Sequence, residues 1–342
     1  MRETSQEISA TDVNLPSIPT SLQSLLDSDG ALHFNRRKHL IDVEALSASE
    51  IEAIVETARS LKTLMSQGQL PLRALSGKSI ATLFFENSTR TRSSFELAAA
   101  NLDAHVLNLD ISSSSVAKGE TIDDTARTIS AMGVSAIIQR HAQSGWPERL
   151  REVAPPAISI INAGDGWRGH PTQALLDYLT MIEICRSVEG KKIVIVGDIK
   201  HSRVARSNIS LLKKFGADIH VCGPPPLVPY GIESLGVRSH TDLFTAVEGA
   251  DFIMALRLQK ERQKQGLIPS TADYAHLYRV DHACLKIARP GARILHPGPI
   301  NRGIEITGAL ADDPARSLIT TQVTNGIAVR MAVLLILLRN GD

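Results

Sequence analysis

The feature that most constrains this chain is a repeated alternation of short apolar runs with helical stretches. In the first half the runs lie at residues 79–85, 105–109, 136–139 and 157–162. Helices are expected to begin between them, near Thr91, Thr121 and Trp146. Alternation of this kind predicts a parallel sheet whose faces are covered by helices.

The same alternation starts again after a long expected helix at residues 172–186. The runs of the second half lie at residues 192–197, 218–222, 251–255 and 293–295. With 342 residues the chain is also long enough for two domains of ordinary size. We therefore predict an α/β protein with two doubly wound parallel-sheet domains, residues 36–185 and 186–322, joined by interdomain helices.

The two ends of the chain differ in character. Residues 1–35 are rich in Ser, Thr, Asp and Pro without lasting periodicity, which predicts a mobile or loosely attached tail. Residues 324–339 are apolar on nearly all sides, which is typical of a buried helix. We expect this C-terminal segment, residues 323–342, to pack back on the first domain.

Composition argues against several classes of protein. The chain has 37 basic and 36 acidic residues, so nothing favours nucleic acid or an anionic membrane as a partner. Its cysteines, Cys185, Cys222 and Cys284, are far apart and lack CxxC spacing, so neither a disulfide framework nor a metal site is expected. The apolar run at residues 329–338 is shorter than the ~20 residues of a membrane-spanning helix, and no signal pattern begins the chain. We expect a cytoplasmic protein.

The most informative segment is Phe84-Phe-Glu-Asn-Ser-Thr-Arg-Thr-Arg92, in which an apolar strand runs directly into a helix start. Free backbone N–H groups and the helix dipole favour a phosphate there, and Ser88, Thr89, Arg90 and Thr91 add hydroxyl and guanidinium donors. A generic S-T-x-T would more often be an ordinary helix cap. The whole string instead indicates a phosphate cradle.

This string closely resembles the phosphate-binding signature of the aspartate and ornithine carbamoyltransferases. Further motifs follow in family order over roughly residues 38–340: SSSSVAKGET at 112–121, Arg140-His141, HPTQ at 170–173, GDIKHSRVARSN at 197–208, RLQKER at 257–262 and HPGP at 296–299. The resemblance implies transfer of the carbamoyl group of carbamoyl phosphate to an amino-acid amine, with no cofactor. With L-aspartate as acceptor, this is a step of pyrimidine (UMP) biosynthesis.

The resemblance also assigns a site to carbamoyl phosphate, in which Arg140 bridges phosphate and carbonyl oxygen and His170 donates to that oxygen. A histidine taken alone is more often a core or surface residue, but His170 stands one helical turn before Gln173, on the same face. The implied carbamoyl phosphate ligands are Ser88, Thr89, Arg90, Thr91, Arg140, His170, Gln173, Gly298, Pro299 and, from a neighbouring subunit, Ser114.

L-Aspartate carries two carboxylates and calls for separate arginine or lysine groups. Arg203 and Arg257 each follow an apolar strand run, although salt-bridged surface arginines are commoner. The resemblance adds Gln259, and Lys118 from the neighbouring subunit, although composition alone would make Lys118 a solvated loop residue. It thereby implies a homotrimer with shared active sites, and leaves open whether regulatory or dihydroorotase chains join it.

No paired carboxylates or Ser/His/Asp arrangement accompany these motifs, so we expect the departing phosphate to take the amine proton. Catalysis then rests on positioning, on stabilising the oxyanion and on closure of the two domains. The residues to which the resemblance gives catalytic roles are Arg90, Thr91, Arg140, His170 and Lys118.

Three other functions fit the sequence less well. Ornithine carbamoyltransferases typically show HCLP and SMG motifs, whereas this chain has HPGP and the arginine-bearing Arg257-Leu-Gln259, which fits aspartate. A nucleotide-binding protein would need GxGxxG after residues 193–196, and the spacing at Gly197 is wrong. A silent scaffold subunit should have lost anion-site residues, and none is missing. Two departures from the family pattern are Gly298 in HPGP and Trp167-Arg168-Gly169 before HPTQ.

Overall fold

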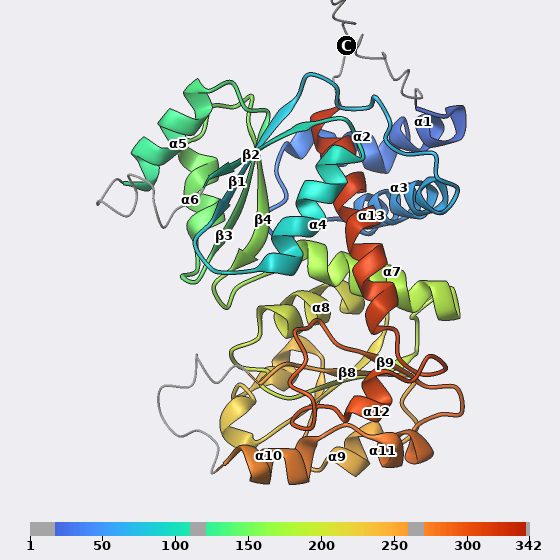
Figure 1. Ribbon diagram of the computed structural model, residues 1–342. Coiled ribbons are helices and arrows are strands. Elements are labelled where there is room, and N and C mark those ends of the chain that lie inside the picture. The colour runs from blue at the N-terminus through green and yellow to red at the C-terminus, as the bar shows by residue number, and fades with distance from the viewer. Residues whose placement is uncertain (1–17, 110–120, 259–269, 340–342) are drawn as a thin grey trace, which may run out of the picture.

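The computed structural model describes residues 18–109, 121–258 and 270–339, and it contains two parallel sheets, one in each half of the molecule (Figure 1). The first sheet has the order β2-β1-β3-β4, with β1 (Ser79–Phe84), β2 (His105–Leu109), β3 (Ala136–His141) and β4 (Ser159–Asp165). The second has the order β7-β6-β5-β8-β9, with β5 (Lys192–Val196), β6 (Asp218–Cys222), β7 (Arg238–His240), β8 (Phe252–Ala255) and β9 (Arg293–Leu295). The predicted α/β fold with two parallel sheets is confirmed.

Each sheet contains a point where the direction of winding reverses. The first sheet winds from β1 to β2 on one side and then continues on the other side with β3, which pairs with β1 through Phe84 and Arg140. The second winds from β5 through β6 to β7 and then returns to β8, which pairs with β5 through Val196 and Ala255. Ligands of doubly wound sheets bind beside the carboxyl ends of the strands at such a reversal. Two crevices are therefore expected, after β1 and β3 and after β5 and β8.

One strand was missed. The eight apolar runs correspond to β1–β6, β8 and β9, but Arg238–His240 was not predicted. This β7 has three residues, lies at the sheet edge and buries none of them, so it carries no apolar signal.

Helices cover both sheets. Those of the first half are α1 (Thr20–Leu26), α2 (Asp29–Arg37), α3 (Ala48–Ser66), α4 (Thr89–Ala100), α5 (Ile122–Ala131), α6 (Trp146–Val153) and α7 (Pro171–Cys185). Those of the second are α8 (Arg203–Lys214), α9 (Leu243–Val247), α10 (Thr271–Tyr278), α11 (His282–Ile287), α12 (Gly308–Ala311), α13 (Ile319–Leu338) and the 3-10 turns η3 (Pro225–Leu227) and η4 (Ile232–Leu235). Helix α7 contacts α8, and α13 contacts β9, so these helices join the two halves.

The C-terminal helix α13 is longer than the apolar run suggested. It begins at Ile319, because a polar first turn with Thr320 and Gln322 precedes the apolar part. Its 20 residues would be long and apolar enough to cross a membrane, but 78% of the most apolar stretch is buried inside the protein. It packs against α3, α4 and α7 (Figure 1). The helix is therefore a core element.

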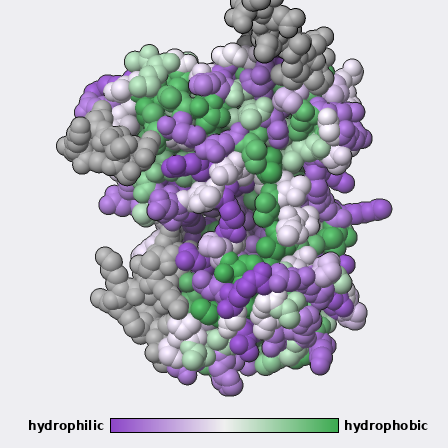
Figure 2. Space-filling model, in the orientation of Figure 1, coloured by the Kyte–Doolittle hydropathy of each residue, from purple (hydrophilic) through white to green (hydrophobic). Residues whose placement is uncertain are grey.

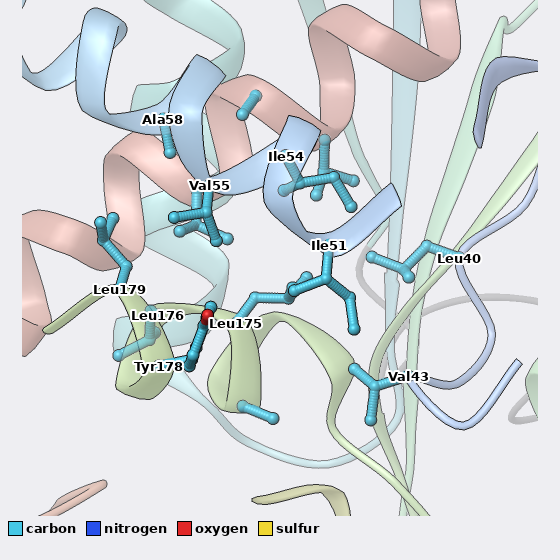
Figure 3. Close-up of a cluster of buried hydrophobic side chains, with 14 of the residues drawn as sticks. Leu40, Val43, Ile51, Ile54, Val55, Ala58, Leu175, Leu176, Tyr178 and Leu179 are labelled. Atoms are coloured by element: carbon cyan, nitrogen blue, oxygen red, sulfur yellow. The ribbon is translucent and has the colours of Figure 1, made fainter. Parts of the chain in front are cut away.

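Figure 3 shows part of this core, where α3 and α7 meet beside α13. The side chains of Ile51 and Val55 on α3 lie toward Leu175 and Leu179 on α7, and Ile54 belongs to the same buried cluster. Helix α3 is held at its start by a capping box between Ser47 and Glu50. This packing fixes α7, and α7 carries two of the predicted site residues at its N-terminal end.

The prediction of a loose tail was wrong for residues 20–35. Helices α1 and α2 pack against α3, and Leu22, Leu26, Ala31 and Phe34 are fully buried. These helices are short and polar on their outer faces, so a few buried side chains hold them without a long apolar period. The expectation for residues 1–17 lies outside the part of the chain that the structure describes. The domain boundaries themselves stay a prediction.

Candidate active site

A cavity of about 850 Å³ lies where the segments after β1, β3, β5, β8 and β9 meet the starts of α4, α7 and α13. Figure 2 shows hydrophilic side chains gathered at the waist between the two halves of the molecule. The predicted site residues that the structure describes all line this cavity: Ser88, Thr89, Arg90, Thr91, Arg140, His170, Gln173, Arg203, Arg257, Gly298 and Pro299. The predicted Ser114, Lys118 and Gln259 lie outside the described residues.

The turn from β1 into α4 has the form expected of an anion cradle. Ser88 is the N-cap of α4, yet its hydroxyl makes no capping bond. The first-turn N–H groups of a helix have no partner within the helix, and the first turn of α4 contains no acidic residue. The hydroxyl of Ser88 and these N–H groups can therefore bind a phosphate.

Arginine dominates the charge of the cavity. Among the described lining residues, one carboxylate, Glu86, accompanies six arginines: Arg90, Arg140, Arg203, Arg257, Arg302 and Arg330. Partial burial of its guanidinium and the neighbouring Arg257 lower the pKa of Arg90. Grouping cations in this way is unfavourable unless anions are bound, so the cavity is suited to substrates with several negative charges.

Glu86, which the sequence analysis did not single out, binds two of these arginines. Its Oε1 accepts from Arg140 Nη2 at 3.1 Å, and its two oxygens accept from Arg203 Nη2 at 3.1 Å and Nη1 at 2.9 Å. Arg140 is the penultimate residue of β3 in the first half, and Arg203 opens α8 in the second. A single carboxylate thus connects the two crevices. The only signal in the sequence was one acidic residue inside a basic string.

Gly164 makes room for the same two arginines. A Cβ atom at this position would lie 2.9 Å from Arg140 Nη1 and 3.0 Å from Arg203 Cζ, closer than side chains pack. Arg140 Nη1 also donates to the carbonyl of Ala163 at 3.1 Å. Both guanidiniums therefore pack against the backbone at the end of β4.

His170 is the N-cap residue of α7 and is only 4% exposed. Its backbone N–H donates to Ser207 Oγ at 2.9 Å, and among the described residues its Nδ1 has no hydrogen-bond partner. Burial, followed by the charges of Arg140 and Arg203, lowers the pKa of His170 well below 6.5. The ring is therefore neutral at pH 7 and can donate one N–H to a substrate oxygen without adding positive charge.

Gly298 explains one departure from the family pattern. A Cβ atom at position 298 would overlap the guanidinium of Arg90, so a side chain there would require that guanidinium to move, and the positive φ of 60° also favours glycine. The loop is held by His296, whose Nδ1 accepts the Gly298 N–H at 2.8 Å and whose Nε2 lies 3.1 Å from Glu305 Oε1. Glycine here lets the carbamoyl loop approach the phosphate cradle.

The second departure includes Trp167, which is not among the lining residues of the cavity. Its ring meets the ring of His201 edge-on, with 4.8 Å between centroids. His201 follows β5 in the second half and bonds Asp198 through Nδ1 at 2.9 Å. Trp167 is therefore a contact between the two halves.

Comparisons with known proteins agree with this arrangement. Residues 38–183 match the family model described as "Aspartate/ornithine carbamoyltransferase, carbamoyl-P binding domain", and residues 189–337 match "Aspartate/ornithine carbamoyltransferase, Asp/Orn binding domain". The chain belongs to the aspartate/ornithine carbamoyltransferase family. Within this family, the aspartate carbamoyltransferase catalytic subunit of Moorella thermoacetica is 50% identical over 89% of this chain and 98% of its own. That of Gloeobacter violaceus is 47% identical over 88% and 94%.

Solved carbamoyltransferase structures have the same fold. Aspartate transcarbamoylase from Trypanosoma cruzi, in complex with carbamoyl phosphate and aspartate, matches with a TM-score of 0.78 and 31% identity over 88% of this chain and 96% of its own. Ornithine carbamoyltransferase from Pyrococcus furiosus matches with a TM-score of 0.80 and 32% identity over 89% and 98%. The fold is therefore common to members with either acceptor, and the acceptor has to be decided by the chemistry of the site.

Proposed function

We propose that this carbamoyltransferase transfers the carbamoyl group of carbamoyl phosphate to the amine of L-aspartate, giving N-carbamoyl-L-aspartate and phosphate, a step of pyrimidine (UMP) biosynthesis. The observation that carries the proposal is one cavity in which a helix-start cradle, a neutral buried histidine and arginines of both halves converge. Its relatives named as aspartate carbamoyltransferase catalytic subunits, at about half identity over most of the chain, support the same reaction.

The phosphate of carbamoyl phosphate is assigned to the start of α4. Thr89 and Arg90 open the helix and line the cavity together with Thr91, which is buried. Backbone N–H groups, hydroxyls and the guanidinium together supply charge-assisted hydrogen bonds to the phosphate oxygens. These bonds become stronger as negative charge moves onto the departing phosphate, which is where catalysis needs them.

The carbonyl oxygen is assigned to Arg140 and His170. When the aspartate amine attacks the carbonyl carbon, this oxygen becomes an oxyanion in the tetrahedral intermediate. A buried guanidinium and a neutral imidazole N–H stabilise that charge in a site partly shielded from water. Collapse of the intermediate breaks the bond to the phosphate oxygen, and the phosphate leaves with the amine proton.

The two carboxylates of L-aspartate are assigned to Arg203 and Arg257. Arg203 follows β5 and Arg257 follows β8, on either side of the reversal in the second sheet. An ornithine side chain would instead bring an ammonium group into a cavity already lined by arginines. The charge of the cavity thus favours the dicarboxylate.

We further propose a cytoplasmic homotrimer in which Ser114 and Lys118 of each subunit complete the site of its neighbour. The cavity as described has no lysine among its lining residues, so a lysine from another chain would add the further cation that a substrate pair rich in anionic groups can use. Gln259 would assist aspartate binding. The mass of the native assembly would show whether regulatory or dihydroorotase chains join the trimer.

The bisubstrate compound N-(phosphonacetyl)-L-aspartate, which is bound by the Trypanosoma cruzi relative, provides a direct binding test. Calorimetry with the purified protein should give tight binding, at least about a hundredfold tighter than the matched N-phosphonacetyl-L-ornithine, because the ornithine compound loses a carboxylate contact and adds a cation. Equal or tighter binding of the ornithine compound would contradict the proposed acceptor.

A further inference from the structure

A buried polar cluster forms part of the cavity wall, and of its members only Gln173 is among the implied carbamoyl phosphate ligands. We call it the amide cluster, and it consists of Gln173, Asp177, Asn208 and Gln322. Its members come from α7, α8 and α13, and all four side chains are buried. Buried polar groups of this kind cost stability unless every hydrogen bond is made, so their arrangement is well determined.

Asp177 is the centre of the amide cluster. Its Oδ1 accepts from Gln173 Nε2 at 2.9 Å and from Gln322 Nε2 at 2.7 Å, and its Oδ2 accepts from Asn208 Nδ2 at 2.9 Å. An ionised carboxylate only accepts hydrogen bonds, so each amide must turn its nitrogen toward Asp177. The carboxylate therefore determines which way three amides point.

Gln322 provides an independent check on these orientations. Its Oε1 accepts the backbone N–H of His296 at 2.9 Å, and an N–H can only donate. The nitrogen of Gln322 must therefore be the atom that faces Asp177, which requires an acceptor there. The backbone N–H of His296 thus fixes the orientation of Gln322, and Gln322 in turn requires Asp177 to be an acceptor, whatever the orientation of Gln173.

Protonation supports the same arrangement. Burial raises the pKa of Asp177 to about 6, while the bonds from Asn208, Gln322 and Gln173 and the charge of Arg330 act in the opposite direction. At pH 7 to 8 the group is mainly a carboxylate. It then has no hydrogen with which to hold an amide in the reversed orientation.

Gln173 also lines the cavity. Because its Nε2 is held by Asp177, the amide of Gln173 turns Oε1 away from that carboxylate, and this oxygen is the acceptor that the side chain can offer to a substrate. We propose that Asp177 is a positioning residue that holds the Gln173 oxygen toward the substrate, so that the site selects the NH2 of a carbamoyl group over a methyl group. This inference rests on the proposed function, because it explains how the same cavity recognises the carbamoyl end of its substrate.

The same carboxylate reaches the opposite wall of the carbamoyl site. Through Gln322 it connects to the N–H of His296, the first residue of the loop that carries Gly298 and Pro299. Removing Asp177 should therefore loosen two walls that meet at the carbamoyl NH2. It should leave the phosphate cradle on α4 in place, because no member of the amide cluster bonds to Ser88 or Thr89.

The first test compares carbamoyl phosphate with acetyl phosphate, which carries CH3 in place of NH2, each with L-aspartate. In Asp177→Leu the ratio of the two kcat/KM values should fall by about tenfold or more, because Gln173 can then turn either way. Inhibition by inorganic phosphate should be unchanged. Asp177→Asn keeps an acceptor oxygen for the two glutamine amides, so its ratio of kcat/KM values should stay close to that of wild type.

Asn208→Ala is the matched control. It removes one hydrogen bond from Asp177 but leaves both glutamine contacts, so it should lower the unfolding temperature without changing the ratio. A folded Asp177→Leu variant with the wild-type ratio would overturn the inference. An equal fall of the kcat/KM ratio in Asn208→Ala and Asp177→Leu would also overturn it, because the ratio would then depend only on the stability of the fold.

A second pair of variants decides the question if Asp177→Leu does not fold. Gln173→Glu places a carboxylate against Asp177 and should lose affinity for carbamoyl phosphate at pH 8, because the two charges repel. Adding Asp177→Asn supplies a hydrogen-bond donor for Glu at position 173. The double variant should bind carbamoyl phosphate at least about tenfold more tightly than Gln173→Glu alone. No recovery in the double variant would overturn the inference. If wild type fails to carbamoylate aspartate at all, the proposed function has failed instead.

Discussion

Glu86 and Arg203 join the two halves of the molecule across the cavity, with Arg203 Nη1 2.9 Å from Glu86 Oε2 and Arg203 Nη2 3.1 Å from Glu86 Oε1. Arg203 is 4% exposed, and Arg140 donates to the same carboxylate from the other side. Two buried guanidiniums this close repel each other unless an anion lies between them. Glu86 is that anion, so it fixes the position of two arginines assigned to different substrates.

The first prediction concerns this carboxylate. Glu86→Gln should lower kcat/KM for aspartate by about tenfold, because Arg140 and Arg203 lose the charge that holds them together. Inhibition by inorganic phosphate should change less, since the start of α4 does not depend on Glu86. Tighter binding of aspartate by Glu86→Gln than by wild type would contradict this prediction, because it would mean that Glu86 competes with the substrate for Arg203 instead of positioning it.

The second prediction separates the two ends of the cavity. Arg90→Ala should abolish measurable binding of carbamoyl phosphate, whereas Arg257→Ala should mainly weaken aspartate binding and leave the phosphate site intact. Calorimetry with each substrate measures both affinities. Arg302→Ala is the control, because Arg302 lines the same cavity but is paired with Asp312 at 2.8 Å. Equal loss of both affinities in Arg90→Ala or Arg257→Ala, with folding preserved, would contradict this division.

Much of this arrangement was predictable because its signals are local. Every strand except β7 coincides with a mainly apolar run, and the phosphate cradle is one uninterrupted string from Phe84 to Arg92. Strand order then brings Arg140, Arg203 and Arg257 to the carboxyl ends at the two reversals. Side chains that follow apolar strands are therefore expected to meet at one site, whereas their individual roles rest on the resemblance to the carbamoyltransferases.

The rest depends on contacts between residues far apart in the chain. Asp177 has its role because Asn208 and Gln322 reach it from other helices, and no local pattern marks that meeting. Glu86 likewise becomes important only when Arg203 approaches it across the cavity. The helices α1 and α2 were missed because their few buried side chains give little periodic signal.

The third prediction concerns pH and His170. Its folded pKa lies well below the ordinary value of 6.5, so the unfolded chain takes up a proton first as the pH falls. His170 should therefore cost the folded state stability as the pH drops below about 6.5. Urea unfolding at pH 7.5 and pH 5.5 should show a smaller loss of stability in His170→Gln than in wild type. The same loss in both proteins would show that His170 is not held neutral in the folded state.

The fourth prediction tests the proposed sharing of sites between subunits. Lys118→Ala and His170→Ala subunits should each be inactive alone, because one lacks the donated lysine and the other the oxyanion donor. Mixed under conditions of subunit exchange, they should regain part of the activity, since hybrid trimers contain some intact sites. Two differently tagged copies would verify the exchange. Absence of recovery after verified exchange would rule out the shared arrangement.

The most direct test of the central claim is turnover by the purified chain alone. It would be supplied with carbamoyl phosphate and either L-aspartate or L-ornithine, and the ureido product would be measured. We predict N-carbamoyl-L-aspartate with aspartate and no product with ornithine, because the arginines of the cavity pair with a second carboxylate and repel a second ammonium group. Citrulline formation from ornithine, or no product from either amino acid, would contradict the account.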